Sequence, residues 1–332
     1  MCKGASFRNV RGCLNDYFPY SENRVCNILG IKYPIVEGGM AWAGESTLAA
    51  AVSNSGALGT LGAGSLDGEQ LRKEIAVIRK LTDKPFAINL LVISPYFEEC
   101  LKVIFEEKID NVILGGGNPG STLKWLKDEG KTVLCVVSSD NLAKMLEREG
   151  ADIIIAEGSE SGGHIGNVSS LVLIPSIKES ISIPVISAGG ISDGKTAAAT
   201  IILGAEGIQM GTRFLASNEA KIHENYKNMI LKSGICDTIV TGRALGHPVR
   251  VIKNRFSKRI LNLELIDKLA AEKELIGSLG KAVASGDRKN GSFMAGQSAG
   301  RIEDILSVEE IISTISKDIE KILNIDEVFK DE

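Results

Sequence analysis

The sequence has few aromatic residues and little net charge. Phenylalanine, tryptophan and tyrosine make up 5% of its 332 residues, which argues against an aromatic platform for stacking nucleic-acid bases. The formal net charge of −4 gives no global reason to expect nucleic acid or an anionic membrane as a partner. No apolar run reaches the ~18 residues that a membrane helix needs. We therefore expect neither nucleic-acid binding nor membrane insertion.

Cysteine motifs are also absent, although the chain has six cysteines. No two of them form a CxxC pair, so there is neither a zinc-binding spacing nor a disulfide framework, and we predict no metal site. Cys100 and Cys135 lie in apolar surroundings and are expected to be buried core thiols. The basic residues Lys3, Arg8 and Arg11 are not followed by an apolar segment, so they do not form a secretory signal. The expected location is a reducing cytoplasm.

Glycine, in contrast, is abundant, and apolar runs alternate with amphipathic stretches from Pro34 onward. Eight runs are expected to be strands: 35–36, 57–61, 86–92, 111–114, 132–137, 152–156, 184–188 and 207–210. The expected helices between them are 46–55, 68–81, 96–108, 121–129, 140–149, 169–180 and 194–203. Eight strands close a parallel barrel, so we predict an α/β fold of the TIM-type (β/α)8 class. A doubly wound open sheet is the alternative, but residues 37–42 lack its GxGxxG turn.

The alternation divides the chain into four parts. Residues 1–24 lack periodicity and form an N-terminal extension, and residues 25–217 form the barrel. Residues 218–293 interrupt the alternation and are predicted to be an inserted, mainly helical lid or substrate domain. Residues 294–332 form a C-terminal segment that packs back on the barrel and includes a helix at 308–323. Within the lid, apolar residues at helical spacing predict one helix face: Val249, Ile252, Phe256, Ile260, Leu263 and Ile266.

A histidine among glycines follows the sixth expected strand. His164 lies in residues 156–166, just past the apolar run 153–155, and is one of three histidines in the chain. Glycines let a flat ligand approach the backbone, and an imidazole can donate or accept a proton. A glycine-rich turn with a surface histidine is the other interpretation. Loops after parallel strands are, however, where ligands usually bind.

Two glycine-containing turns follow the seventh and eighth expected strands. Gly189 and Gly190 come after the seventh, and Gly211 and Thr212 come after the eighth. In many barrels these loops bind a phosphate through backbone N–H groups and the start of a short helix. One such pair could be only a tight turn. Two pairs at consecutive strand ends favour a phosphate site.

Two polar residues stand in or beside apolar strands. Asn89 interrupts the run 86–92, and a buried amide must be hydrogen-bonded, either within the core or to the polar edge of a flavin ring. Glu157 near His164 presents the same choice, and a ribityl hydroxyl is a natural partner for its carboxylate. Both residues are therefore candidates for ligand contact.

The sequence resembles the flavin-dependent enoyl-acyl-carrier-protein reductase II (FabK) family, within the nitronate monooxygenase-like superfamily. The stretches that carry this resemblance are 33–42, 81–86, 116–119, 156–166, the two glycine pairs and 291–300. The resemblance implies a barrel that binds FMN. It places Gly39 and Met40 against the isoalloxazine, Asn89 at the ring, Glu157 and Gly162 on the ribityl side, and Ala188, Gly189, Gly190, Gly211 and Thr212 at the phosphate. It implies that His164 is the catalytic group, and Gln297 and Ser298 are expected to bind substrate. His247 is either a structural lid residue or a further substrate-binding candidate, because Gly246 and Pro248 fix a turn around it.

The superfamily contains two reactions that the residues help to separate. Nitronate monooxygenases carry a tyrosine-glutamine-glutamine-glycine stretch that this chain lacks, whereas residues 286–300, 116–119 and 246–250 resemble the reductase. We therefore expect NADH or NADPH to reduce FMN and an enoyl-acyl carrier protein or enoyl-CoA to be the substrate. Nitronate oxidation, or a flavin-binding protein without this turnover, are the alternatives.

Two further expectations concern a basic stretch in the lid and the oligomeric state. The predicted lid contains Arg243, Arg250, Lys253, Arg255, Lys258 and Arg259, which could complement an acidic carrier protein or form only a solvated helix face. The resemblance also implies a homodimer and stimulation by a monovalent cation.

Overall fold

The computed structural model describes residue 17 and residues 20–323. Most of the predicted extension 1–24 and the end of the C-terminal segment lie outside this part, so those expectations stay predictions. Within residues 20–323, no helix is long and apolar enough to cross a membrane, and no group of histidine, cysteine, aspartate and glutamate side chains could hold a metal ion. Cys100 and Cys135 are buried in the core, as predicted.

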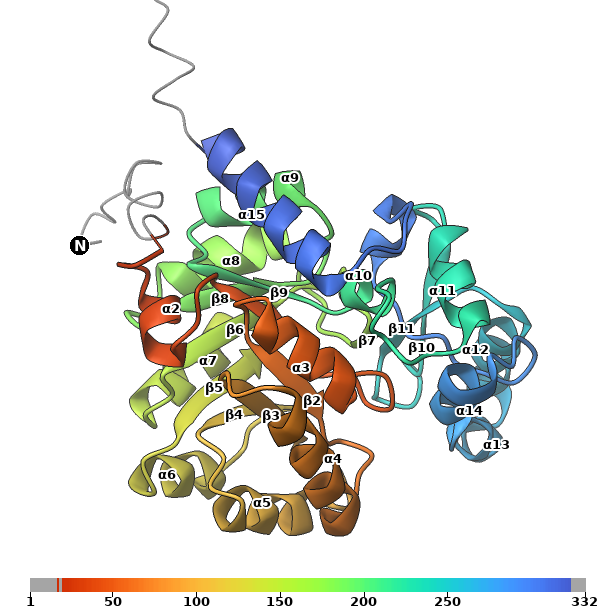
Figure 1. Cartoon of the computed structure of the whole chain (residues 1–332). Coiled ribbons are helices and arrows are strands. Elements are labelled where there is room, and N and C mark those ends of the chain that lie inside the picture. Colours follow the sequence, from red (N-terminus) through yellow and green to blue (C-terminus); the bar gives the residue numbers. More distant parts are fainter. Residues whose placement is uncertain (1–16, 18–19, 324–332) are drawn as a thin grey trace, which may run out of the picture.

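Eight parallel strands form a barrel (Figure 1). The strands are β1 (Ile35–Glu37), β2 (Gly59–Gly62), β3 (Phe86–Leu91), β4 (Asn111–Gly115), β5 (Thr132–Val137), β6 (Ile153–Glu157), β8 (Val185–Ala188) and β9 (Gly207–Met210). Their order is β1-β9-β8-β6-β5-β4-β3-β2, and a parallel bridge between Val36 and Leu58 joins the two end strands. Each strand overlaps one of the expected apolar runs. The predicted (β/α)8 class is therefore confirmed.

Helices surround this barrel (Figure 1). They are α3 (Ser46–Asn54), α4 (Gly68–Leu81), α5 (Phe97–Glu106), α6 (Ser121–Asp128), α7 (Asp140–Arg148), α8 (Ser170–Lys178), α9 (Gly194–Ile202) and α15 (Val308–Leu323). Side-chain caps fix the starts of α4, α7 and α9; at α4 the Asp67 carboxylate accepts the Gln70 N–H in a capping box. Helix α15 packs against α9 and α3, so it occupies the place of the helix that should follow the eighth strand.

Apolar side chains fill the interior of the barrel. Val36, Ile113 and Ile155 share one buried cluster with Val25 and Leu29 of helix α2 (Arg24–Leu29). Burial of each such side chain stabilises the fold by about 1.5–3 kcal/mol. Because α2 covers the amino-terminal end of the strands, the carboxyl end is the one left for a ligand.

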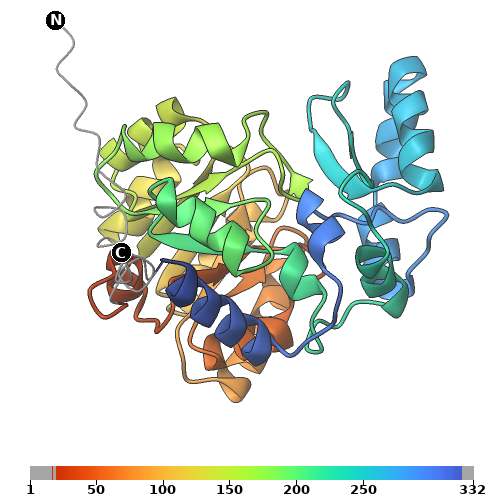
Figure 2. The same cartoon turned by 90° about the horizontal axis from the view of Figure 1, so that it is seen from above.

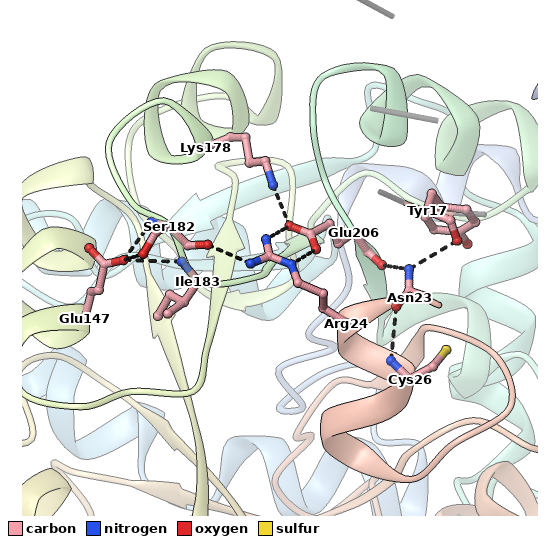
Figure 3. A network of polar contacts seen from close by, with 9 residues as sticks. All are labelled: Tyr17, Asn23, Arg24, Cys26, Glu147, Lys178, Ser182, Ile183 and Glu206. Carbon is pink, nitrogen blue, oxygen red and sulfur yellow. Dashed lines mark hydrogen bonds and ion pairs between the residues drawn. The ribbon is translucent and has the colours of Figure 1, made fainter. Parts of the chain in front are cut away.

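A buried carboxylate fixes α2 to the barrel (Figure 3). Glu206 precedes β9, is fully buried, and accepts hydrogen bonds from the Arg24 guanidinium and the Lys178 ammonium. The Asn23 side chain donates to the Glu206 carbonyl at 2.9 Å, and Arg24 Nη1 donates to the Ser182 carbonyl at 2.8 Å. These contacts join α2 to α8 and to the segments that precede β8 and β9.

A second lobe interrupts the chain between the eighth strand and α15 (Figure 2). It contains α11 (Glu224–Leu231), β10 (Thr238–Thr241), β11 (Val249–Ile252), α12 (Arg255–Ile266), α13 (Lys268–Leu275) and α14 (Ser278–Ser285), and it follows the short α10 (Thr212–Leu215). The Asn218 N–H donates to the Leu306 carbonyl at 2.9 Å, so the outgoing and returning segments lie side by side. The returning segment includes a 3-10 helix, η1 (Gln297–Arg301).

The predicted apolar helix face in this lobe is wrong in part. Val249 and Ile252 lie in strand β11, which pairs antiparallel with β10 and with β7 (Gly163–His164). Phe256 and Ile260 are buried on α12, but Ile266 is 83% exposed. The β-branched segment 249–252 follows Pro248 and finds strand partners on both sides, which outweighs its chance agreement with helical spacing.

Candidate active site

A cavity of about 250 Å³ opens at the carboxyl ends of the barrel strands. It is lined by most of the residues that the sequence singled out: Gly39, Met40, Asn89, Glu157, Gly162, His164, Ala188, Gly189, Gly190, Gly211, Thr212 and Ser298. Gln297 and His247 are exposed and do not line the cavity. Gln297 begins η1 beside Ser298, and His247 lies in the turn between β10 and β11.

The loop after β1 lies directly on Asn89. A Cβ atom on Gly39 would come within 2.3 Å of Asn89 Oδ1, so no side chain fits at this position. Asn89 Nδ2 donates to the Ile113 carbonyl at 3.4 Å, which orients the amide oxygen toward this loop. The result is a flat backbone surface with an amide edge, a shape suited to a planar heterocycle.

The turns after β8 and β9 allow a ligand to approach the backbone closely. Gly189 and Gly190 have φ angles of +96° and +78°, in the left-handed region that glycine tolerates best. The Thr212 hydroxyl accepts the Gly296 N–H at 2.9 Å, so its side chain holds the returning segment in place. The backbone of these two turns remains the surface on which a phosphate could be bound.

Gln209 is a site residue that sequence reasoning missed. It lies on β9 between Ile208 and Met210, is 8% exposed and lines the cavity. Its Oε1 atom has no hydrogen-bond partner in the described part of the chain. A buried amide without a partner costs free energy unless a ligand contacts it. Its signal, a polar residue inside an apolar strand, is the same as that of Asn89.

His164 lies where the barrel meets the lid. It belongs to β7, and its register partner on β11 is Val249. Its side chain is exposed on the open side of the cavity, yet the surrounding protein desolvates it and lowers its pKa below 6.5, and the charge of His247 lowers it further. The imidazole is therefore neutral at neutral pH, with one N–H donor and one acceptor.

Glu157 faces the same cavity from the end of β6. Burial raises its pKa to about 7, and the Ser161 hydroxyl beside it opposes this shift by a smaller amount. The carboxyl group is therefore partly protonated near neutral pH. When charged it can accept a hydrogen bond from a ligand hydroxyl, and when protonated it can donate a hydrogen bond to a ligand acceptor.

The pKa of Glu157 predicts how stability depends on pH. In the flavin-free protein, Glu157 retains a proton between its ordinary pKa of 4.5 and about 7, whereas the unfolded chain loses it. The folded state binds more protons in this window, so raising the pH from about 5 to about 8 should remove up to about 3 kcal/mol of stability. Urea unfolding of Glu157→Gln should lack this component. An unchanged pH dependence in the variant would contradict the prediction.

The fold and this cavity define a flavin-type oxidoreductase barrel, and comparisons with known proteins identify its family. The nitronate monooxygenase family model matches residues 22–100 and 93–318, so the chain belongs to that family, whose members are flavin enzymes. A probable nitronate monooxygenase of Staphylococcus aureus (strain MSSA476) is 35% identical over 352 residues, covering 92% of this chain and 99% of the relative.

Two solved structures show how close the likeness is. The structure of FabK from Thermotoga maritima is 49% identical, with a TM-score of 0.91, and the match covers 92% of this chain and 98% of that one. Nitroalkane oxidase from Streptomyces ansochromogenes is 24% identical, with a TM-score of 0.80 and coverage of 90% and 98%. The second likeness concerns the fold alone.

Proposed function

We propose that this protein is an FMN-dependent enoyl-acyl-carrier-protein reductase that uses NADH or NADPH to reduce a trans-2-enoyl thioester. The observation that carries this proposal is the position of the reductase-like segment 291–300. Met294, Gly296 and Ser298 from this segment line the cavity beside His164. The likeness to FabK over most of both chains supports the same reaction.

Three of the hydrogen bonds that hold this segment come from different parts of the fold. The Tyr226 hydroxyl donates to the Met294 carbonyl at 2.6 Å, and the Gly296 N–H donates to the Thr212 hydroxyl at 2.9 Å. The Gln297 N–H donates to the Glu160 carbonyl at 2.9 Å. Because these partners come from the lid, the β9 turn and the His164 loop, the segment forms a rigid wall to which a substrate can be fitted.

The residues of the cavity fit FMN. The unpartnered Gln209 amide and the Asn89 amide offer hydrogen-bonding groups to a ring, and the glycine turns after β8 and β9 offer backbone to a phosphate. When bound, FMN supplies the hydride chemistry. His164 would donate its N–H to the thioester carbonyl oxygen, and this hydrogen bond would favour addition of the hydride at the β-carbon. We assign Ser298 and Gln297 of η1 to the substrate side of the cavity.

Nitronate oxidation is the second candidate, because the S. aureus relative is called a probable nitronate monooxygenase and matches over almost its full length. In that reaction His164 would act on a nitronate in place of a thioester. Binding of flavin without either turnover is a third outcome. Acyl carrier protein as carrier, a homodimer and stimulation by a monovalent cation are further proposals from the resemblance.

One anaerobic experiment separates these functions. The purified protein should be yellow and should release FMN when denatured. NADH or NADPH should bleach the flavin under anaerobic conditions, and crotonyl-CoA should restore its colour. Rapid oxygen-dependent turnover of a nitronate without a nicotinamide would favour the second candidate. A colourless protein that takes up no FMN would refute the site itself.

A further inference from the structure

Two arginines and a histidine stand beside the mouth of the cavity, and neither arginine forms an ion pair within the described part of the chain. We call Arg243, His247 and Arg250 the rim cluster; they lie on and beside the turn that joins β10 to β11. Strand β11 pairs with β7, and the Ile165 N–H donates to the Pro248 carbonyl at 3.1 Å. The base of the turn therefore lies beside β7, the strand that carries His164, and Figure 1 shows β7 and β11 between the barrel and the lid.

The backbone of the turn is held in one conformation. The His247 N–H donates to the Gly242 carbonyl at 3.0 Å, and the Gly242 N–H donates to the buried Glu264 carboxylate. Gly242 has a φ of +76°, and a Cβ atom there would come within 2.3 Å of the His247 carbonyl oxygen. Arg243 Nη1 donates to Asn167 Oδ1 at 3.0 Å, so the arginine is tied to the His164 loop. The backbone of the turn and the Arg243 side chain are thus held in place by the protein itself.

Arg250 supplies a fixed charge beneath the turn. It is 8% exposed and donates to the Ser159 carbonyl at 2.8 and 3.1 Å and to Thr238 Oγ1 at 3.0 Å. Burial lowers its pKa, the charge of Arg243 lowers it further, and Glu160 opposes both. The Glu160 carboxylate accepts the backbone N–H and hydroxyl of Ser170 and forms no ion pair with Arg250.

Arg250 forms no ion pair within the described part of the chain although it is buried, whereas the equally buried Arg213 pairs with Asp304. Arg24, Arg213 and Arg301 each form an ion pair with a carboxylate. Across residues 20–323, no such pair is formed by Arg243 or Arg250. Two arginines within electrostatic range of each other repel, and an anion bound between the turn and the cavity would relieve that repulsion.

We propose that Arg243 and His247, supported by Arg250, bind a phosphate group of a reactant whose reacting end enters the cavity beside His164. Guanidinium and imidazole N–H groups suit the several oxygens of a phosphate. The inference rests on the proposed function, whose two large reactants carry phosphates remote from the reacting atoms. One source is the pantetheine-linked thioester carrier, and the other is the nicotinamide dinucleotide.

The test uses FMN-loaded Arg243→Gln and His247→Gln, with Lys268→Gln on α13 as a matched loss of lid charge. Calorimetry compares coenzyme A with pantetheine, which lacks phosphate. Anaerobic flavin reduction compares NADH and NADPH with 1-benzyl-1,4-dihydronicotinamide, which also lacks phosphate.

Each rim variant should weaken binding of one phosphate-bearing compound by about tenfold. The phosphate-free analogue and the Lys268→Gln control should stay within about twofold. The difference should shrink between about 0.05 M and about 0.5 M salt.

The calorimetric comparison and the flavin-reduction comparison together show which reactant supplies the phosphate. A loss confined to coenzyme A assigns the rim to the thioester carrier, and a loss confined to NADH or NADPH assigns it to the reductant. Three results would overturn the inference. The rim variants could lose as much affinity for the phosphate-free analogues as for the phosphate-bearing compounds, they could lose affinity for neither, or the wild-type protein could bind none of these compounds. Tight binding of coenzyme A without enoyl-thioester reduction would instead refute the proposed function and leave the rim site standing.

Discussion

Replacing His164 by alanine should lower enoyl-thioester turnover by about 10²-fold or more while FMN remains bound. The imidazole stands at the junction of cavity and lid, on a two-residue strand whose partner is β11. It lies beside the proposed substrate wall, so its loss should remove a hydrogen bond to the reacting carbonyl and leave the glycine turns after β8 and β9 intact. The decrease should appear mainly in kcat, because the contact strengthens as charge develops on the carbonyl oxygen.

Another histidine provides the control. His223 precedes α11, and its Nδ1 accepts the Asn225 N–H at 3.0 Å as a helix cap. His223→Asn should retain a cap and leave turnover nearly unchanged. His164→Gln, which keeps an N–H donor, should recover part of the lost rate. Unchanged turnover in His164→Ala, with flavin bound, would remove this residue from the proposed reaction.

The barrel could be predicted because its signals are local. Most strands are short apolar runs that end at or just before glycine or a polar residue, and the number of runs matches the number that closes a barrel. The predicted site residues follow from the same reasoning, because the carboxyl ends of all parallel strands meet at one end. Asn89, Glu157 and Gly189 are far apart in sequence, yet all line one cavity.

The sheet in the lid could not be predicted because its signal is not local. Strand β7 is only Gly163–His164, and its pairing with Val249 depends on a contact across more than eighty residues. Spacing alone made Val249 and Ile252 look helical. Gln209 was missed for a related reason, since only the register of β9 shows that its side chain points to the cavity. The position of His247 outside the cavity lining likewise depends on the turn between β10 and β11.

The largest expected loss of stability comes from the opposite end of the barrel. Glu206→Ala should lower the free energy of unfolding by about 3 kcal/mol or more, because it removes the fully buried carboxylate to which Arg24 and Lys178 both donate. The Lys178 side chain is 12% exposed and cannot regain full hydration, whereas Arg24 at 44% can do so in part. The Asn23 contact to the Glu206 carbonyl should survive, since it involves only backbone oxygen.

An exposed ion pair gives the comparison for this loss. Glu69 and Lys73 pair on α4 with side chains that are 78% and 70% exposed, so Glu69→Ala should change the free energy of unfolding by less than about 1 kcal/mol. Urea unfolding of both variants measures the difference. FMN affinity and turnover of Glu206→Ala should remain near wild type at temperatures where it is folded, because α2 and the cavity lie at opposite ends of the strands. A stable Glu206→Ala protein that loses FMN would show instead that the buried carboxylate is coupled to the site.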